Sequence, residues 1–409
     1  MSHQQSDGSG EYRFAVTPLP ADDVRSRQLP RNMAPHPLNY QELPFEPEYF
    51  VYNGRLASGR MNNATDEETY WLVRRQVILR HTGERPIEVS GPDAEALLNH
   101  LFTRDITRVK VGRCSYQFAC YHDGGMITDG VLMRLEQERF WYAQADGDLF
   151  SWFRAHAHGL NVAVSDPGVW VSQVQGPRAF DVLESVVEGD APESFRYFDV
   201  ARVRIAGQPV ILSRSGFTNE LGWEFYLEPG ADARAIGDRI LTAGERFGMK
   251  PVGAVAFRTR RIEAGLLSAG ADFDATVTPF AAGLGQFVDL QKTDFIGKAA
   301  LEAGDRRRRT WGLQVDGGVA ELGNTLALDG IPAGVVCSSA WSPYLQRGVA
   351  IVRLDNPVLV PGAQLEVACT DHGLRPADLC DTPMYDAARE IPRGKRIDIP
   401  EIPTTPIES

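Results

Sequence analysis

A unit of one strand, a Gly-Pro pair and one helix occurs twice in this chain, and no other feature constrains the fold as strongly. In the first copy, the alternating residues 86–91 predict a strand, and residues 92–102 predict a helix with proline in its first turn. In the second copy, residues 169–175 predict the strand and residues 178–184 the helix, again joined by Gly-Pro. Two copies of one unit indicate two related α+β halves rather than a doubly wound parallel sheet.

The composition changes along the chain and divides it into four parts. Residues 1–40 are rich in Ser, Gln, Pro and Arg and predict an extended or disordered arm. Residues 41–304 hold both copies of the repeated unit. Residues 305–385 carry short alternating runs between Gly and Pro, which are typical of a small β-barrel or sandwich. Residues 386–409 form a Pro-rich, charged tail.

Charge and cysteine usage argue against several classes of partner. A formal net charge of −12 over 409 residues argues against nucleic acid or an anionic membrane surface as the main partner. No apolar run approaches the ~20 residues that a membrane span needs. The five cysteines form no CxxC pair, which fits free thiols in a reducing compartment. We therefore expect a cytoplasmic protein with neither nucleic acid nor membrane as its partner.

Several common catalytic motifs are missing from the sequence. It contains no GxxxxGKS or GxxxxGKT phosphate loop, no HExxH zinc motif and no GxGxxG between a predicted strand and helix. The eight histidines show no metal-ligand spacing. This pattern disfavours a metal, nucleotide-phosphate or nicotinamide enzyme, and we expect no metal.

Residues 213–226 predict a hairpin of strand, tight turn and strand, with Gly216 and Gly222 in the connection. Alternation then puts Glu224 and Tyr226 on one face of the second strand. A carboxylate beside aromatic rings can bind a flat heterocycle whose edge offers N–H donors. An ordinary hairpin with a solvated glutamate is the alternative at this stage.

A second predicted hairpin has strands at 112–121 and 126–133 around a Gly-Gly turn, and it carries Asp129 among apolar residues. A carboxylate there is expected to be partly buried with a shifted pKa. The alternative is a strand-end aspartate satisfied by the N–H groups of the turn. For Arg261 and Glu263, spacing alone indicates a solvated helix face.

Taken in order, the motifs of this chain resemble the folate-dependent aminomethyltransferase family, which includes the glycine-cleavage T-protein. The resemblance implies two interleaved α+β folate-binding domains plus a C-terminal β-barrel domain, around a central hole that holds tetrahydrofolate. The matching segments are 101–105, 123–129, 175–177, 214–217, 222–224, 261–265, 294–301 and 342–343.

The resemblance also implies roles for individual residues. Asp129 matches the catalytic aspartate near folate N5, where it either orients N5 or moves its proton. Glu224 matches the carboxylate that binds the pterin, because a carboxylate can accept from two adjacent N–H groups. Arg261 matches an arginine near the folate's glutamate tail. Tyr116 and Gln175 are expected as further folate-binding residues.

A further set of segments most resembles the demethylase branch of this family, typified by dimethylsulfoniopropionate demethylase. They are 49–52, 68–71, 112–114, 214–217, 224–226, 266–268 and 272–274. That resemblance implies that Tyr226 lies beside both substrate and folate as a second catalytic residue. It also implies that Phe217, Tyr52 and Trp223 lie on the side of the methyl donor. Aromatic faces suit an onium cation through cation–π attraction.

The hypothesis from the sequence is therefore a methyl transfer from a small methylated donor, a sulfonium or a quaternary amine, to N5 of tetrahydrofolate. One alternative is the aminomethyltransferase of glycine cleavage, although T-proteins usually show two acids where this chain has Thr128-Asp129. Others are an aryl methyl ether O-demethylase, with Tyr226 as general acid, and a non-catalytic folate-binding protein. A homodimer is left open as the assembly state.

Overall fold

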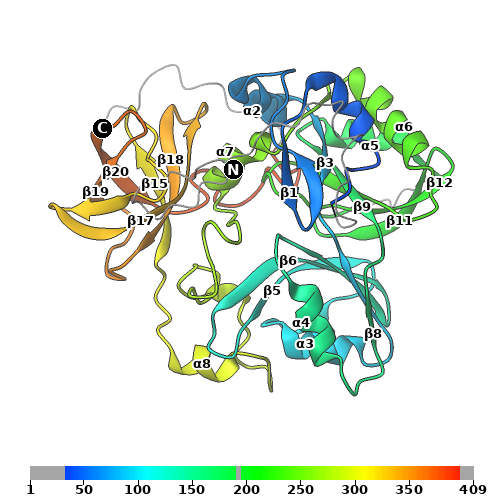
Figure 1. Cartoon of the computed structure of the whole chain (residues 1–409), viewed down its shortest axis with the longest axis horizontal. Coiled ribbons are helices and arrows are strands. Elements are labelled where there is room, and N and C mark those ends of the chain that lie inside the picture. Colours follow the sequence, from blue (N-terminus) through cyan, green and yellow to red (C-terminus); the bar gives the residue numbers. More distant parts are fainter. Residues whose placement is uncertain (1–32, 190–194, 397–409) are drawn as a thin grey trace, which may run out of the picture.

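The computed structural model describes residues 33–189 and 195–396, which form three lobes. In Figure 1 the closed barrel lies at the left, a seven-stranded sheet at the upper right and a five-stranded sheet at the bottom. This is the α+β architecture with a C-terminal β-barrel that the sequence predicted. Most of the expected N-terminal arm, and the end of the expected tail from residue 397, lie outside the described residues.

The seven-stranded sheet carries two helices on one face. Apolar residues of α5 (Ala179–Val186) and α6 (Ala233–Glu245) share one core with inward residues of the sheet such as Trp223 and Phe225. The strand order is β10-β11-β12-β13-β9-β3-β14, and only the β3–β14 pair is parallel. The strands are β10 (Val187–Glu188), β11 (Val200–Ile205), β12 (Gln208–Ser213), β13 (Gly222–Leu227), β9 (Trp170–Gln175), β3 (Ile78–Thr82) and β14 (Lys250–Pro251).

The five-stranded sheet is built in the same way, with α3 (Ala94–Leu101) and α4 (Leu149–His156) packed on its core. Its strand order is β5-β6-β7-β4-β8, and all its pairs are antiparallel. The strands are β5 (Arg113–Cys120), β6 (Met126–Glu136), β7 (Arg139–Gln144), β4 (Ile87–Ser90) and β8 (Ala163–Ser165).

The predicted repeat is visible in the backbone. Gly91 follows β4 with φ +125° and Gly176 follows β9 with φ +131°, conformations that only glycine adopts readily. A Cβ on Gly91 would lie 2.7 Å from the Asn161 carbonyl, and one on Gly176 would lie 2.5 Å from the Gln76 carbonyl. The two strand–Gly-Pro–helix units therefore adopt one geometry for one steric reason.

The two halves are interleaved because each sheet takes a strand from the other part of the chain. Strand β3 precedes the first unit in sequence, yet it pairs with β9 in the second sheet. Strand β8 directly precedes β9, yet it pairs with β4 in the first sheet. The orders β5-β6-β7-β4-β8 and β11-β12-β13-β9-β3 then correspond strand by strand.

The barrel is a closed antiparallel sheet with its own apolar core. Helix α7 (Val255–Ala264) packs on α2 (Asp66–Arg75) and on the barrel strands β17 and β18, so it joins the barrel to the α+β part. The barrel strands are β15 (Thr310–Val315), β18 (Arg347–Leu354), β17 (Ile331–Ser342), β16 (Thr325–Leu328), β19 (Gln364–Ala368) and β20 (Leu374–Cys380).

The remaining elements are short. A hairpin of β1 (Tyr49–Tyr52) and β2 (Arg55–Ser58) precedes α2, whose first turn is closed by a capping box between Thr65 and Glu68. The others are α8 (Lys298–Ala303) and the 3₁₀ turns η1 (Asn39–Gln41), η2 (Leu43–Phe45), η3 (Ile106–Arg108) and η4 (Gly285–Phe287).

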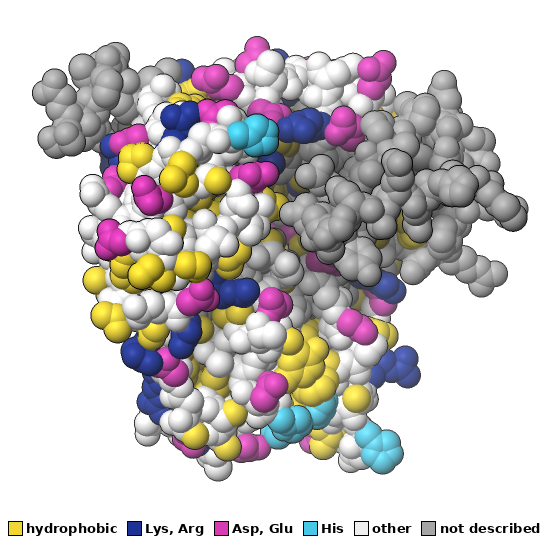
Figure 2. Space-filling view, turned by 60° about the vertical axis from the view of Figure 1, so that its left-hand side comes forward, with side chains coloured by type: hydrophobic (Ala, Val, Ile, Leu, Met, Phe, Trp, Pro, Cys, Tyr) yellow, Lys and Arg dark blue, Asp and Glu magenta, His cyan; other side chains and the backbone are white. Residues whose placement is uncertain are grey.

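The surface mixes charges of both signs. On the face shown in Figure 2, acidic and basic side chains are interspersed with scattered apolar ones. Within residues 33–189 and 195–396, none of the helices has the length and apolar character that crossing a membrane requires.

Candidate functional site

Glu224 is the buried carboxylate around which the candidate site is built. It lies on β13, opposite Gln173 of β9 and on the other face of the strand from Phe225. Its carboxylate accepts hydrogen bonds from the Gln173 amide at 3.0 Å, the Tyr226 hydroxyl at 3.1 Å and the Ser215 hydroxyl. Three neutral donors therefore hold Glu224 in one orientation.

Glu84 is a second carboxylate at the same place, and one amide joins the two. The Gln173 amide nitrogen lies 3.3 Å from Glu84 Oε1 as well as 3.0 Å from Glu224 Oε1. Glu84 Oε2 and Gln173 Oε1 are buried and accept no hydrogen bond. Among the described residues, no Lys, Arg or His forms an ion pair with either glutamate. The cluster is thus rich in acceptors, and Arg80 acts on Glu84 only through space.

The pKa values of the two glutamates reflect the excess of buried acceptor groups at this place. Burial raises the pKa of Glu84 to about 8, and the nearby charge of Glu224 adds to the shift. Burial also raises the pKa of Glu224, whereas the hydrogen bonds from Ser215 and Tyr226 act in the opposite direction. Near neutral pH the pair therefore carries less than two negative charges unless a cation or an N–H-rich ligand is bound.

Asp129 lies on β6 of the five-stranded sheet and is buried, as expected from the sequence. The Tyr116 hydroxyl donates a hydrogen bond of 2.7 Å to its Oδ2. Burial raises the pKa of Asp129 to about 6; the Tyr116 hydrogen bond lowers it, and the charge of Asp272 raises it. A carboxylate that titrates this close to neutral pH can hold or take a proton.

Arg261 projects from α7 toward the same region, but its guanidinium already has partners. Its Nη1 lies 2.5 Å from Asp272 Oδ2, and its Nη2 donates to the Ser338 hydroxyl at 2.7 Å. Asp272 is the residue whose charge reaches Asp129. An anionic ligand group would therefore meet an arginine that is paired with a fully buried carboxylate.

Tyr52, at the end of β1, is influenced by acidic residues near both sheets, Glu84 beside the seven-stranded sheet and Asp129 on the five-stranded one. The pKa of its phenol is raised first by burial and then by the charges of Glu84, Asp129 and Asp146. Tyr52 also packs against the residue before Glu84, since a Cβ on Gly83 would lie 3.4 Å from the Tyr52 ring. Tyr52 is therefore an aromatic residue beside the Glu84 segment, and the charge of Asp129 also acts on its phenol.

A cavity of about 630 Å³ adjoins this part of the site. Its lining includes Asn53 and Arg85, which directly follow Tyr52 and Glu84, and Asp146, whose neighbour Ala145 donates its N–H to the Asp129 carbonyl. Arg85 is the only basic residue in the lining and pairs with Asp166 at 2.6 Å. The acidic lining residues are Asp146, Asp148, Asp166 and Asp274.

Gln175 holds the β12–β13 hairpin from inside. Its amide donates to the Ser215 carbonyl at 3.0 Å and accepts from the Thr218 hydroxyl at 2.8 Å. Its side chain fills the space beside two glycines, since a Cβ on Gly216 or Gly222 would lie 2.2 Å from it. Both ends of the amide that the sequence assigned to folate binding are therefore engaged within the protein.

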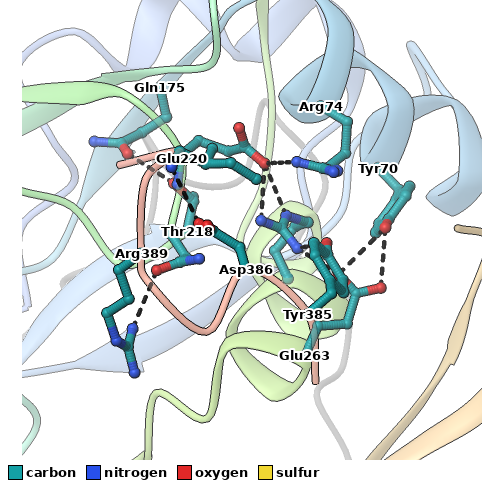
Figure 3. A network of polar contacts seen from close by, with 12 residues as sticks. Tyr70, Arg74, Gln175, Thr218, Glu220, Glu263, Tyr385, Asp386 and Arg389 are labelled. Carbon is teal, nitrogen blue, oxygen red and sulfur yellow. Dashed lines mark hydrogen bonds and ion pairs between the residues drawn. The ribbon is translucent and has the colours of Figure 1, made fainter. Parts of the chain in front are cut away.

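A buried ionic network anchors the same hairpin from the other side (Figure 3). Glu220 of the connection accepts from Arg74 of α2 at 2.5 Å and lies 2.8 Å from Arg260 of α7. Arg260 pairs in turn with Glu263. The hydroxyls that donate to Glu263 belong to Tyr70, Tyr385 and Ser342.

The segment after the barrel completes this support. Tyr385 brings the segment that follows β20 onto the network, and Arg389 donates to Asn219 of the hairpin connection at 3.1 Å. The connection spans residues 214–221 and is therefore longer than the tight turn expected from the sequence. It is nevertheless held at several points, which fixes the position of Glu224.

The remaining predicted residues lie elsewhere or have other partners. Trp223 belongs to the core under α5 and α6 and packs against Phe195, on the opposite face of β13 from Glu224. Phe217 packs against the cluster that contains Val73 and Phe257. Tyr226 is fully buried between the sheets, with its hydroxyl bound to Glu224.

Sequence reasoning missed Glu84, Gln173 and Ser215. A signal for Gln173 exists, because Gln173 and Gln175 are polar residues two apart inside a predicted strand and so share a face. Glu84 lies in Gly83-Glu84-Arg85-Pro86, which has the composition of an exposed turn. In the described ranges, no three His, Cys, Asp or Glu side chains converge in a way that could hold a metal ion.

Comparison with known proteins assigns the chain to a family. The GCVT N-terminal domain family matches residues 36–292, and the glycine cleavage T-protein C-terminal barrel domain family matches residues 308–386. The chain therefore belongs to the glycine cleavage T-protein family of folate-dependent transferases, which uses tetrahydrofolate as its co-substrate.

Curated relatives of similar identity carry different names. The chain is 34% identical to the trimethylamine-oxide aldolase of Ruegeria pomeroyi over 370 residues, which cover 86% of this chain and 47% of the aldolase. It is 33% identical to the dimethylsulfoniopropionate demethylase of the same organism over 300 residues, covering 72% and 81% of the two chains. It is 31% identical to an aminomethyltransferase of Lysinibacillus sphaericus over 320 residues, covering 76% and 86%. The chain thus spans about half of the aldolase, and these identities leave the one-carbon donor open.

The fold comparison agrees with the family. The structure matches the glycine cleavage system aminomethyltransferase T from Bartonella henselae with a TM-score of 0.77. The match covers 86% of this chain and 98% of that one at 23% sequence identity, and it shows the shared fold.

Proposed function

We propose that this protein transfers a methyl group from a small methylated donor to N5 of tetrahydrofolate. The observation that carries the proposal is the buried pair of Glu224 and Gln173: Glu224 forms no ion pair among the described residues, and Gln173 Oε1 is buried without a hydrogen-bond partner. A pterin edge presents adjacent N–H groups, and these fit an acceptor cluster of this kind. When bound, tetrahydrofolate supplies the N5 lone pair that accepts the methyl group, while the donor leaves with its bonding electrons and N5 loses its proton.

The chain's own residues supply binding, orientation and a proton acceptor. Glu224 would bind the pterin, and the two anchors of the β12–β13 hairpin keep its carboxylate in place. Asp129 would orient N5 or accept its proton, and its raised pKa keeps it able to do either near neutral pH. Tyr116 fixes the Asp129 carboxylate through its hydrogen bond. Alignment of the reacting groups is then the main catalytic contribution.

The test is a direct assay for the product. The purified protein is incubated without oxygen with tetrahydrofolate and a panel of sulfonium, quaternary ammonium, methylamine and methoxyaryl donors. We expect 5-methyltetrahydrofolate, detected by chromatography, from at least one donor. If tetrahydrofolate binds but no donor in the panel yields this product, the proposed methyl transfer is wrong.

The aminomethyltransferase of glycine cleavage is the second candidate, because relatives with that name cover most of the chain at 31–32% identity. It differs from the first in its product and its carrier. Incubation with an aminomethyl-loaded lipoyl carrier protein would then give 5,10-methylenetetrahydrofolate and ammonia. Formation of these products in place of 5-methyltetrahydrofolate would favour the second candidate.

A further inference from the structure

Glu84 differs from Glu224 in what remains free on its carboxylate. Glu224 Oε2 accepts from both Ser215 and Tyr226, so that oxygen is fully used inside the protein. Glu84 accepts one long hydrogen bond from Gln173 at 3.3 Å, and its Oε2 is buried without a partner. A buried carboxylate oxygen without a donor is costly, which points to a ligand group that completes it.

The segment that carries Glu84 continues directly into the lining of the cavity. The three residues that follow Glu84, Arg85 to Ile87, line the cavity, as do the two that follow Tyr52. The chain neighbours of Glu224, by contrast, are buried in the core under α5 and α6. A small molecule in the cavity would therefore contact the chain directly after Glu84 and Tyr52, whereas no chain neighbour of Glu224 lines the cavity.

The charge of the cavity selects for cations. Four aspartates line it, and its single arginine is already paired with one of them at 2.6 Å. Arg80 is the cation that acts on Glu84 through space, but its guanidinium donates to the Ser58 carbonyl instead. A neutral or anionic ligand would leave this negative potential uncompensated, whereas a cation would be attracted by it.

We propose that Glu84 is a specificity-determining residue that binds the positively charged head of the methyl donor, with the ring of Tyr52 against the same cation. The donor is then an onium or a protonated methylated amine rather than a neutral methyl ether. Glu84 supplies the counter-charge, and Tyr52 supplies an aromatic face of the kind that binds alkylated cations. The assignment of the cation as a methyl donor rests on the proposed function, but the cation site itself does not.

Calorimetry with a simple cation tests the site without turnover. Tetramethylammonium is titrated into the protein saturated with tetrahydrofolate, with tert-butanol as the neutral molecule of similar shape. We expect tetramethylammonium to bind at least about tenfold more tightly than tert-butanol, and Glu84→Gln to remove that preference. The matched control is Glu88→Gln, because Glu88 already has Arg139 as its cation and should leave the affinity unchanged.

Two outcomes would overturn the inference. One is tetramethylammonium affinity that is absent in the wild type or unchanged in Glu84→Gln. The other is a Glu84→Gln protein that loses tetrahydrofolate affinity and keeps cation affinity, which would make Glu84 a folate ligand. Retained melting temperature and folate binding in Glu84→Gln show that the variant is folded. If cation binding depends on Glu84 but no methyl transfer occurs, the proposed function is wrong and the cation site is still supported.

Discussion

The two halves of the molecule share one strand–Gly-Pro–helix scaffold and differ in the charged residues that it carries. The register of β4 with β7 sets Glu88 opposite Trp141, and the register of β9 with β13 sets Gln173 opposite Glu224. Counted from Gly91 and Gly176, these pairs occupy equivalent places. Each half therefore carries one glutamate at this point of its sheet.

The surroundings of the two glutamates are opposite in charge. Glu88 pairs with Arg139 at 2.7 Å and accepts from the Trp141 indole at 2.7 Å, so it is neutralised inside its own half. The position equivalent to Arg139 in the second half is Gly222, where the Gln175 side chain fills the space. Glu224 is left without a cation. The repeat thus provides a scaffold. Three differences at equivalent positions, Gln173 for Glu88, Glu224 for Trp141 and Gly222 for Arg139, leave a carboxylate without an ion pair among the described residues of the second half.

The aromatic residues next to these positions behave alike in both halves. Trp223 is equivalent to Phe140, and Phe225 to Tyr142; all four belong to the cores of their sheets. This equivalence explains why Trp223 is buried in the core instead of facing Glu224.

The largest expected effect concerns Asp129 of the first half. Asp129→Asn removes the carboxylate that would hold or take the N5 proton, so kcat for methyl transfer should fall by roughly 10²- to 10⁴-fold. Tetrahydrofolate affinity, measured by fluorescence titration, should change little. Tyr116→Phe should have a smaller effect, because it removes only the hydrogen bond to Asp129. Unchanged kcat in Asp129→Asn would remove Asp129 from the chemistry.

The second effect tests the charge difference between the halves directly. Glu224→Gln keeps the shape but removes the charge, so we expect tetrahydrofolate to bind about 10- to 100-fold more weakly. Glu88→Gln is the matched change in the first half and should leave the folate affinity within twofold. Equal losses in both variants would show that the two glutamates are not functionally different.

The third prediction tests whether the Gln175 side chain requires a glycine at position 222. Gly222→Ala would place a Cβ 2.2 Å from the Gln175 amide, and overpacking of this kind costs about 2 kcal/mol of unfolding free energy. Gln175→Ala opens the space, so in chemical denaturation the double variant should lose less stability than the sum of the single variants. Additive losses would mean that Gln175 does not occupy the space of the missing arginine.

The smallest effect is the pH dependence of stability without ligand. The folded-state pKa values of Glu84, about 8, and Glu42, about 7, lie above their usual value, so the folded protein keeps protons that the unfolded chain loses. Unfolding free energy should therefore fall between pH 6.5 and 8, by on the order of 1–2 kcal/mol. Below pH 6.5 the buried His36 and His81, whose pKa values are lowered, act in the opposite direction.

Thermal melts of two variants test whether Glu84 causes this fall of the unfolding free energy with pH. Glu84→Gln should flatten it between pH 6.5 and 8, because the residue no longer titrates. Glu88→Gln should keep it, since Arg139 already balances that carboxylate. A slope that persists unchanged in Glu84→Gln would mean that Glu84 is ionised in the free protein.

Much of the architecture could be predicted from local pattern. The strand–Gly-Pro–helix units, the two hairpins and the all-β C-terminal part follow from alternation, helical spacing and turn residues, which act over a few neighbours. The motif order indicated the family and, with it, the expected roles of Asp129 and Glu224. For Asp129 the expected burial is confirmed, whereas the burial of Glu224 was not predicted.

Which polar residues meet depends on strand pairing between distant parts of the chain. Glu84 stands in a turn-like segment and Gln173 inside a strand, and their contact with Glu224 depends on β3, β9 and β13 lying side by side. The repeated scaffold and the burial of Asp129 could be predicted from the sequence, because alternation and turn residues act over a few neighbours. The missing cation beside Glu224, the filled space at Gly222 and the free oxygen of Glu84 depend on residues far apart in the chain, and strand pairing alone brings them together.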